Sequence, residues 1–164
     1  MKKLTLALIS LLLALLCTAQ IVNIPDANFK AALVGNLSIN TNGDDEIQVS
    51  EASAYTGAIN VNSMEIFDLT GIEAFATITS LKCYDNQLTT LDVSNNTALT
   101  DLWCSENQLT TLDVSNNTAL SHFDCSYNQL TTLDVSNNTA LTNLQCHYNQ
   151  LTTLDVSNNT LLTN

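Results

Sequence analysis

Positive charge is scarce in this sequence. Its 164 residues contain four lysines and no arginine, against sixteen aspartates and glutamates, which gives a formal net charge of −12. Such a surface repels phosphate backbones and anionic lipid headgroups. Nucleic acid is therefore not expected as a partner, whereas cations, glycans and basic protein surfaces remain as candidates.

Common catalytic motifs are missing as well. The sequence has no HExxH, no GxSxG and no phosphate-binding P-loop, the patterns of metalloproteases, α/β-hydrolases and nucleotide-binding enzymes. Its two histidines, His122 and His147, are expected to be polar surface residues. We therefore expect no enzymatic activity.

Long apolar runs are limited to the amino terminus. Lys2 and Lys3 precede an almost unbroken apolar run at residues 4–16, and residues 17–19 supply the small side chains that a signal peptidase reads. The run is shorter than the ~20 residues of a membrane span. The pattern favours a signal peptide at residues 1–19 over a membrane anchor or a buried helix. Export to a secreted or cell-surface location follows, and the remaining chain has a net charge of 2 − 16 = −14.

A period of 21 residues dominates the second half of the sequence. The segment LDVSNNTALTDLWCSENQLTT at residues 91–111 recurs from Leu112 and Leu133, and a further copy from Leu154 stops after eleven residues. A degenerate copy occupies residues 67–88. Fixed periods of this size indicate stacked units that cannot fold alone.

The apolar residues in each period have strand spacing. Leu102 and Cys104 are two residues apart, as are Leu112 and Val114, so both pairs predict short strands with one buried face. No part of the repeat has helical spacing. We therefore predict a coil with two short strands in each repeat.

Together these residues form the nested patterns LxxLxCxxNxL and LxxLxVxxNxxL. The sequence resembles the leucine-rich repeat proteins, and in particular a bacterial secreted, internalin-like subclass with nested 21-residue repeats. The resemblance implies a right-handed solenoid with one coil per repeat and a parallel sheet built from the LxC strands. It also implies binding through the exposed positions of those strands.

Three regions are expected along the chain: the signal peptide at 1–19, an N-terminal cap at 20–68 and the repeat array at 69–164. In the cap, IPDANFKAALVG predicts a short helix with Phe29 and Leu33 on one face and Gly35 as its end. The array stops within a repeat, so we expect a fragment of a longer protein. Membrane association is expected only through sequence downstream of residue 164.

Several residues recur unchanged in the repeats. The two asparagine columns are expected to form internal hydrogen-bond ladders, and the cysteines to be small buried apolar residues rather than disulfides or metal ligands. The aspartates are expected to point outward, held by nearby hydroxyl groups, with cation binding as the alternative. The columns are Asn86, Asn107, Asn128 and Asn149; Asn96, Asn117, Asn138 and Asn159; Cys83, Cys104, Cys125 and Cys146; Asp92, Asp113, Asp134 and Asp155.

Outward positions beside the LxC strands vary between copies and carry the single Trp and three of the four Tyr. Exposed aromatic residues mixed with polar ones suit the binding of sugars or protein surfaces, although neutral drift on a solvated face would also give variation. We predict a ligand-binding strip at Lys82, Tyr84, Asp101, Trp103, Glu106, Asp124, Tyr127, Gln145, His147 and Tyr148.

Within the cap, residues 40–51 resemble an EF-hand calcium loop. The resemblance implies oxygen ligands from Asn40, Asn42, Asp44, Glu46 through its carbonyl, Gln48 and Glu51. Two positions depart from the pattern, because Asn40 replaces the first Asp and Asp45 stands where Gly makes the turn. Weak calcium binding and a plain polar loop are both open.

The leading functional hypothesis is a secreted or cell-surface module that binds a protein or glycan through the variable strip. A structural spacer of a cell-surface layer, without its own ligand, is the alternative. Ice binding by the paired threonine columns, such as Thr110 and Thr111, is a minor one.

Overall fold

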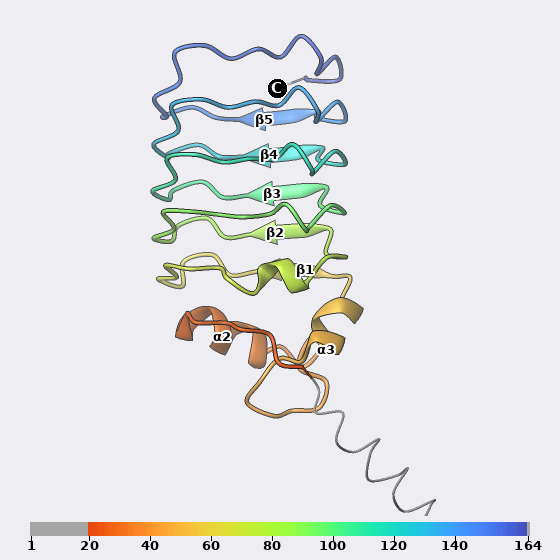
Figure 1. Cartoon of the computed structure of the whole chain (residues 1–164). Coiled ribbons are helices and arrows are strands. Elements are labelled where there is room, and N and C mark those ends of the chain that lie inside the picture. Colours follow the sequence, from red (N-terminus) through yellow and green to blue (C-terminus); the bar gives the residue numbers. More distant parts are fainter. Residues whose placement is uncertain (1–19, 164) are drawn as a thin grey trace, which may run out of the picture.

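The computed structural model describes residues 20–163. Its main feature is one parallel sheet whose strands lie in chain order, one strand per coil (Figure 1). The strands are β1 (Ala58–Asn60), β2 (Ser80–Lys82), β3 (Asp101–Trp103), β4 (His122–Asp124) and β5 (Asn143–Gln145). The predicted leucine-rich repeat solenoid is confirmed.

The core runs through the inside of the stacked coils. Leu81, Leu102 and Phe123 are the central residues of β2, β3 and β4, pair in register and are at most 2% exposed. Cys104, two residues after Leu102, is fully buried. Because side chains alternate across a strand, the flanking residues point outward.

The second predicted strand is wrong. Leu112 and Val114 are buried as expected, but residues 112–114 form no strand, and turns follow at residues 115–116 and 118–119. The Asn117 amide donates to the Val114 carbonyl at 3.0 Å, and the Ser115 amide donates to Asp113 Oδ1 at 2.9 Å. These local bonds hold the turn that follows Val114.

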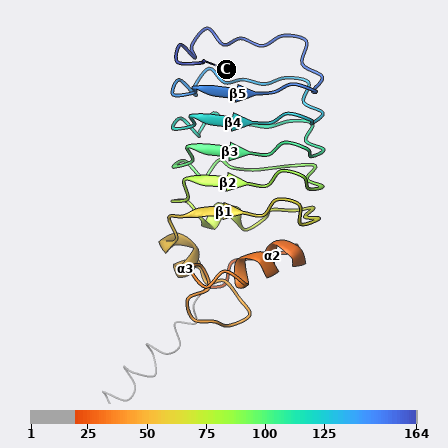
Figure 2. The same ribbon diagram turned by 180° about the vertical axis from the view of Figure 1, so that it is seen from behind.

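The cap covers the first coil. Helix α2 (Ala27–Val34) begins at Asp26, whose Oδ1 accepts the amides of Asn28 and Phe29, and it buries Phe29 and Leu33. Asp26 Oδ2 accepts the Phe67 amide at 2.9 Å, which fastens the helix to the array. The view from behind shows α2 and α3 (Val49–Ala54) next to the coil of β1 (Figure 2).

The first coil begins earlier than the visible repeats. Strand β1 lies in a region whose sequence shows no visible repeat. Its coil nevertheless buries Ile59, Val61 and Ile66 at the inward positions. One 3₁₀ turn, η1 (Ile72–Ala74), lies later in the same coil, between β1 and β2. In residues 20–163, no helix is long and apolar enough to cross a membrane. The predicted signal peptide lies outside the described residues.

Candidate functional site

Two columns of asparagines connect the coils internally. Asn107 Nδ2 donates to the Cys83 carbonyl at 3.0 Å, and its Oδ1 accepts the Leu88 amide at 3.0 Å. Asn117 Nδ2 donates to the carbonyls of Val93 and Asn96. The contacts repeat from coil to coil, as expected for internal hydrogen-bond ladders, and only Asn86 and Asn149 at the two ends of the first column are half-buried rather than buried.

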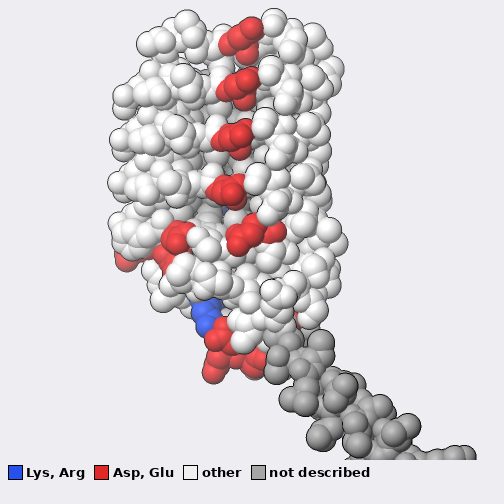
Figure 3. Space-filling model, in the orientation of Figure 1, with Lys and Arg blue, Asp and Glu red and all other residues white. Residues whose placement is uncertain are grey.

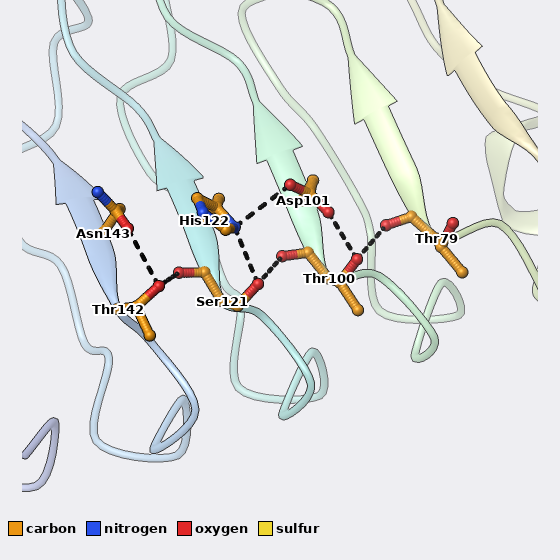
Figure 4. Close-up of polar contacts among 7 residues, drawn as sticks. All are labelled: Thr79, Thr100, Asp101, Ser121, His122, Thr142 and Asn143. Carbon is orange, nitrogen blue, oxygen red and sulfur yellow. Dashed lines mark hydrogen bonds and ion pairs between the residues drawn. The ribbon is translucent and has the colours of Figure 1, made fainter. Parts of the chain in front are cut away.

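A third ladder was missed by the sequence analysis. Thr100 Oγ1 donates to the Thr79 carbonyl at 3.1 Å, Ser121 Oγ to the Thr100 carbonyl at 3.1 Å, and Thr142 Oγ1 to the Ser121 carbonyl at 3.0 Å (Figure 4). A hydroxyl residue recurs at this place in every repeat. That recurrence was the available signal.

The cysteine column is part of the core. Cys83, Cys104 and Cys125 are buried and Cys146 is half-buried, and all four are free thiols. Burial raises the pKa of the Cys83 thiol to about 12, and it raises those of Cys104 and Cys125 well above their ordinary value. These groups therefore remain protonated at neutral pH and serve as apolar packing.

The aspartates form an acidic column along the outside of the stack (Figure 3). Each accepts the amide of the serine two residues later, as in Asp113 with Ser115 and Asp134 with Ser136. The Ser115 hydroxyl and amide lower the pKa of Asp113. The expected hydroxyl contacts are thus joined by a backbone amide at each aspartate.

The strand register brings part of the predicted strip together. Lys82, Trp103, Asp124 and Gln145 occupy one row across adjacent strands. The Lys82 ammonium lies 5.0 Å from the centroid of the Trp103 ring, a cation–π contact. Trp103 is only partly exposed, on the outer face opposite the buried Leu102 and Cys104, as the strip hypothesis requires.

Asp101 lies in the parallel row at the other end of the strands, where it pairs with His122, and His122 pairs in turn with Asn143. His122 Nδ1 is 3.4 Å from Asp101 Oδ1 and 3.0 Å from Ser121 Oγ (Figure 4). Both contacts reach the same ring nitrogen, so the group lacks the two-sided imidazole relay of a Ser-His-Asp triad.

The remaining strip residues lie just after the strands. Tyr127 and Tyr148 are 49% and 69% exposed, and their rings stack at 4.5 Å between centroids. His147 contacts both rings edge-on at 5.3 Å. Glu106 occupies the equivalent place one coil before Tyr127, and Asp85 occupies it one coil before that. Tyr84, the residue before Asp85, is half-buried. The structure thus places a cluster of exposed aromatic residues at the edge of the strand face.

A backbone feature that the sequence analysis missed orders this edge. Asp85, Glu106, Tyr127 and Tyr148 all have positive φ, between 52° and 55°. Few residues other than glycine adopt this left-handed conformation. The recurring turn therefore projects one side chain per coil into a single exposed column.

The predicted calcium loop is closed by its own hydrogen bonds. Asn42 and Gln48 both donate to Asp44 Oδ2, at 2.8 and 2.9 Å, so three of the predicted ligands converge. Glu51 instead accepts the amides of Thr41, Asn42 and Gln48. Asn40 is directed to the Val34 and Asp44 carbonyls, and Glu46 Oε1 pairs with Lys30 at 2.6 Å.

The loop therefore fits a cation only in part. Asn42 and Gln48 meet Asp44 through their amide nitrogens, so both side chains would have to turn to offer oxygens to a cation. A cation that also took Glu51 would have to displace three backbone donors. Calcium binding at residues 40–51 stays a prediction.

The stacked coils, the parallel sheet and the asparagine ladders define a leucine-rich repeat solenoid with an N-terminal cap. Residues 24–159 match the family described as the leucine-rich repeat domain of the endo-β-N-acetylglucosaminidase EndoS. The chain belongs to this family of leucine-rich repeat domains, and it is internalin-like.

Solved structures agree. The functional domain of InlJ from Listeria monocytogenes, described as including a cysteine ladder, is 42% identical with a TM-score of 0.78, over 88% of this chain and 32% of that one. InlF from the same species shares the fold at 21% identity and a TM-score of 0.68, over 88% and 50%. A Leptospira interrogans leucine-rich repeat protein does so at 24% and 0.63, over 68% and 31%.

The chain spans about a third of the length of the InlJ structure and half of that of InlF. None of the curated proteins compared with this chain matches it.

Proposed function

We propose that the chain is an exported binding module that recognises a protein or glycan through the outer face of its sheet. The leucine-rich repeat fold is consistent with a protein-binding module. The observation that carries the proposal is a set of three aromatic residues on the outer side of the sheet, with Trp103 in a strand row and the exposed Tyr127 and Tyr148 at the edge of the sheet. Aromatic anchors of this kind dominate the energetics of binding surfaces.

The rest of the molecule offers less to a partner. The asparagine and hydroxyl columns form hydrogen bonds between coils, and the cysteine column is packed in the core. The threonine columns border a groove that is also lined by Asp92, Ser94 and Asp113. That hollowed, charged surface does not favour the flat hydroxyl face expected for ice binding.

The test replaces the central anchor. The chain from residue 20 onward is screened against a glycan array and against extracellular proteins, and each ligand found is titrated against wild type, Trp103→Ala and Thr110→Ala. We expect Trp103→Ala to weaken binding about 30-fold, equivalent to ~2 kcal/mol. The control Thr110→Ala, which is exposed on another side of the coil, keeps wild-type affinity.

A ligand whose affinity is unchanged by Trp103→Ala would refute the assignment of the site. A second candidate, the structural spacer, is favoured by the near-identity of the other half of each repeat. It predicts that neither screen yields any saturable ligand.

A further inference from the structure

Acidic residues outnumber lysines on the sheet face and along its edge. In residues 20–163 there are two lysines, and both are engaged: Lys30 with Glu46 at 2.6 Å and Lys82 over the Trp103 ring at 5.0 Å. The strand face carries Asp101 and Asp124 in its rows. A partner of complementary charge on this face is therefore cationic.

A second pair of carboxylates lies in line with two aromatic rings at the edge of the sheet. Asp85, Glu106, Tyr127 and Tyr148 lie one per coil along the edge of the sheet, and we name them the acidic–tyrosine column. Their backbones are joined between coils: the Asn107 amide donates to the Tyr127 carbonyl at 3.2 Å, and the Tyr127 amide to the His147 carbonyl at 3.0 Å. The column therefore presents two carboxylates followed by two stacked rings.

We propose that the acidic–tyrosine column binds an extended basic segment of a partner protein. One lysine or arginine of this segment packs against the exposed tyrosine rings, while the next pairs with Glu106 or Asp85. The proposal rests on the proposed function, since it names the class of partner for the same face. The Lys82 contact with Trp103 shows that this face already holds a cation against an aromatic ring.

The spacing suits such a segment. Neighbouring coils of a parallel sheet lie ~4.8 Å apart, and alternate side chains of an extended peptide lie ~6.6 Å apart on one side. A cation over Tyr127 thus places the next cation on the same side between the first and second coils beyond it. Those are the coils of Glu106 and Asp85. Cation–π contacts with the exposed rings and charge-assisted hydrogen bonds to the carboxylates would act together on such a segment.

A neutral glycan would use the same column differently. Sugar rings stack on tyrosine faces but need no carboxylate, so their binding would ignore the charge of Glu106. The two partner classes are therefore separated by the isosteric substitution Glu106→Gln, which removes the charge and keeps the side-chain shape.

The experiment measures fluorescence polarisation with the chain from residue 20 onward, at an ionic strength of about 50 mM to limit screening. The probes are a labelled octapeptide of alternating lysine and threonine, its glutamate–threonine counterpart and a labelled β-1,4-glucan hexasaccharide. We expect only the lysine peptide to bind. Glu106→Gln and Tyr148→Ala should each weaken it at least ~5-fold.

The matched control is Asp113→Asn, which removes one negative charge from the aspartate column and keeps an acceptor for the Ser115 amide. It should change affinity less than 2-fold (on the order of measurement scatter). Equal weakening by Asp113→Asn and Glu106→Gln would overturn the proposal, because binding would then follow net charge alone. Absence of binding by the lysine peptide would also overturn it.

One outcome separates the two levels of inference. If the glucan binds, depends on Trp103 and Tyr148, and ignores Glu106→Gln, the proposed binding function stands and the basic-segment proposal fails. If a bound ligand is insensitive to Trp103→Ala and Tyr148→Ala alike, the face itself is wrongly assigned.

Discussion

At the residue scale, the ladder asparagines are the least replaceable polar residues. Asn107 accepts the Leu88 amide and donates to the Cys83 carbonyl. In Asn107→Ala the Leu88 amide would be left buried and unpaired, whereas the Cys83 carbonyl keeps its bond from Asn86. Leaving one such group unpaired costs ~1–3 kcal/mol, so we expect a loss of about 2 kcal/mol in the free energy of unfolding, measured by urea denaturation. The exposed Asn116, with only a 3.4 Å contact, is the control, and its alanine variant should lose no more than ~0.5 kcal/mol. Similar losses in both variants would contradict the ladder's importance.

The buried thiols give the molecule a specific alkaline limit. Because burial raises the pKa of folded Cys83 from 9.0 to about 12, the unfolded chain ionises first as the pH passes 9.0. The stability contributed by the protonated thiols is therefore fully present below pH 9.0 and is lost as the pH rises above that value. Each of the three buried thiols contributes a slope of ~1.4 kcal/mol per pH unit.

The check is a series of urea titrations between pH 7 and pH 11, with wild type and Cys104→Ala compared directly. The variant should lose stability with a slope smaller by about 1.4 kcal/mol per pH unit. Lysine and tyrosine titrations are the same in both proteins and cancel in the difference. If the stability of both proteins fell equally with pH, burial would not raise the pKa of the Cys104 thiol.

At the element scale, the sequence predicted the inward half of each coil well. Leu102 in β3 and Cys104 just after the strand both point inward, and the partial exposure of Trp103 between them follows from the alternation of side chains. The same spacing at Leu112 and Val114 did not give a strand: residues 112–114 are buried without strand pairing, and Asp113 accepts the Ser115 amide at the turn that follows. Periodicity records which residues are buried, but it does not record how their backbone donors are satisfied.

Two features of the candidate site were out of reach of periodicity for different reasons. The stacking of Tyr127 on Tyr148 depends on the left-handed turn that the two share. A tyrosine does not predict this conformation, which glycine or asparagine usually occupies. The hydroxyl ladder through Thr100 and Ser121, by contrast, was visible as a recurring position and only its role was missed.

The loop at residues 40–51 carries an element-scale prediction. Asp44 meets Asn42 and Gln48, so calcium that displaced these amide contacts would be held by oxygen ligands from all three. We expect millimolar calcium chloride to raise the melting temperature of wild type relative to chelator, and to leave Asp44→Asn unaffected. Magnesium chloride at the same ionic strength is the control. Equal melting temperatures of wild type in calcium and chelator would leave residues 40–51 as a polar loop.

At the scale of the whole molecule, each coil is stable only through its neighbours, since a short coil cannot recover its conformational entropy alone. Leu102 shows this directly: it is fully buried between its register partners Leu81 and Phe123. Leu144 has Phe123 as its partner on one side and is only half-buried. The same substitution should therefore have different costs at the two positions.

We expect Leu102→Ala to lower the free energy of unfolding by about 3–4 kcal/mol and Leu144→Ala by less than ~2 kcal/mol, because the cavity left at Leu102 is enclosed on both sides. Urea denaturation followed by far-UV circular dichroism gives both values. Amide hydrogen exchange adds an independent order, with the Leu102 amide slower than that of Leu144. Equal losses and equal exchange rates would mean that the coils fold as one uniform unit and that stability does not depend on how many neighbours a coil has. Slower exchange at Leu102 together with the larger loss would mean that the stability of a coil depends on its neighbours, since nearest-neighbour stacking makes similar repeats energetically unequal.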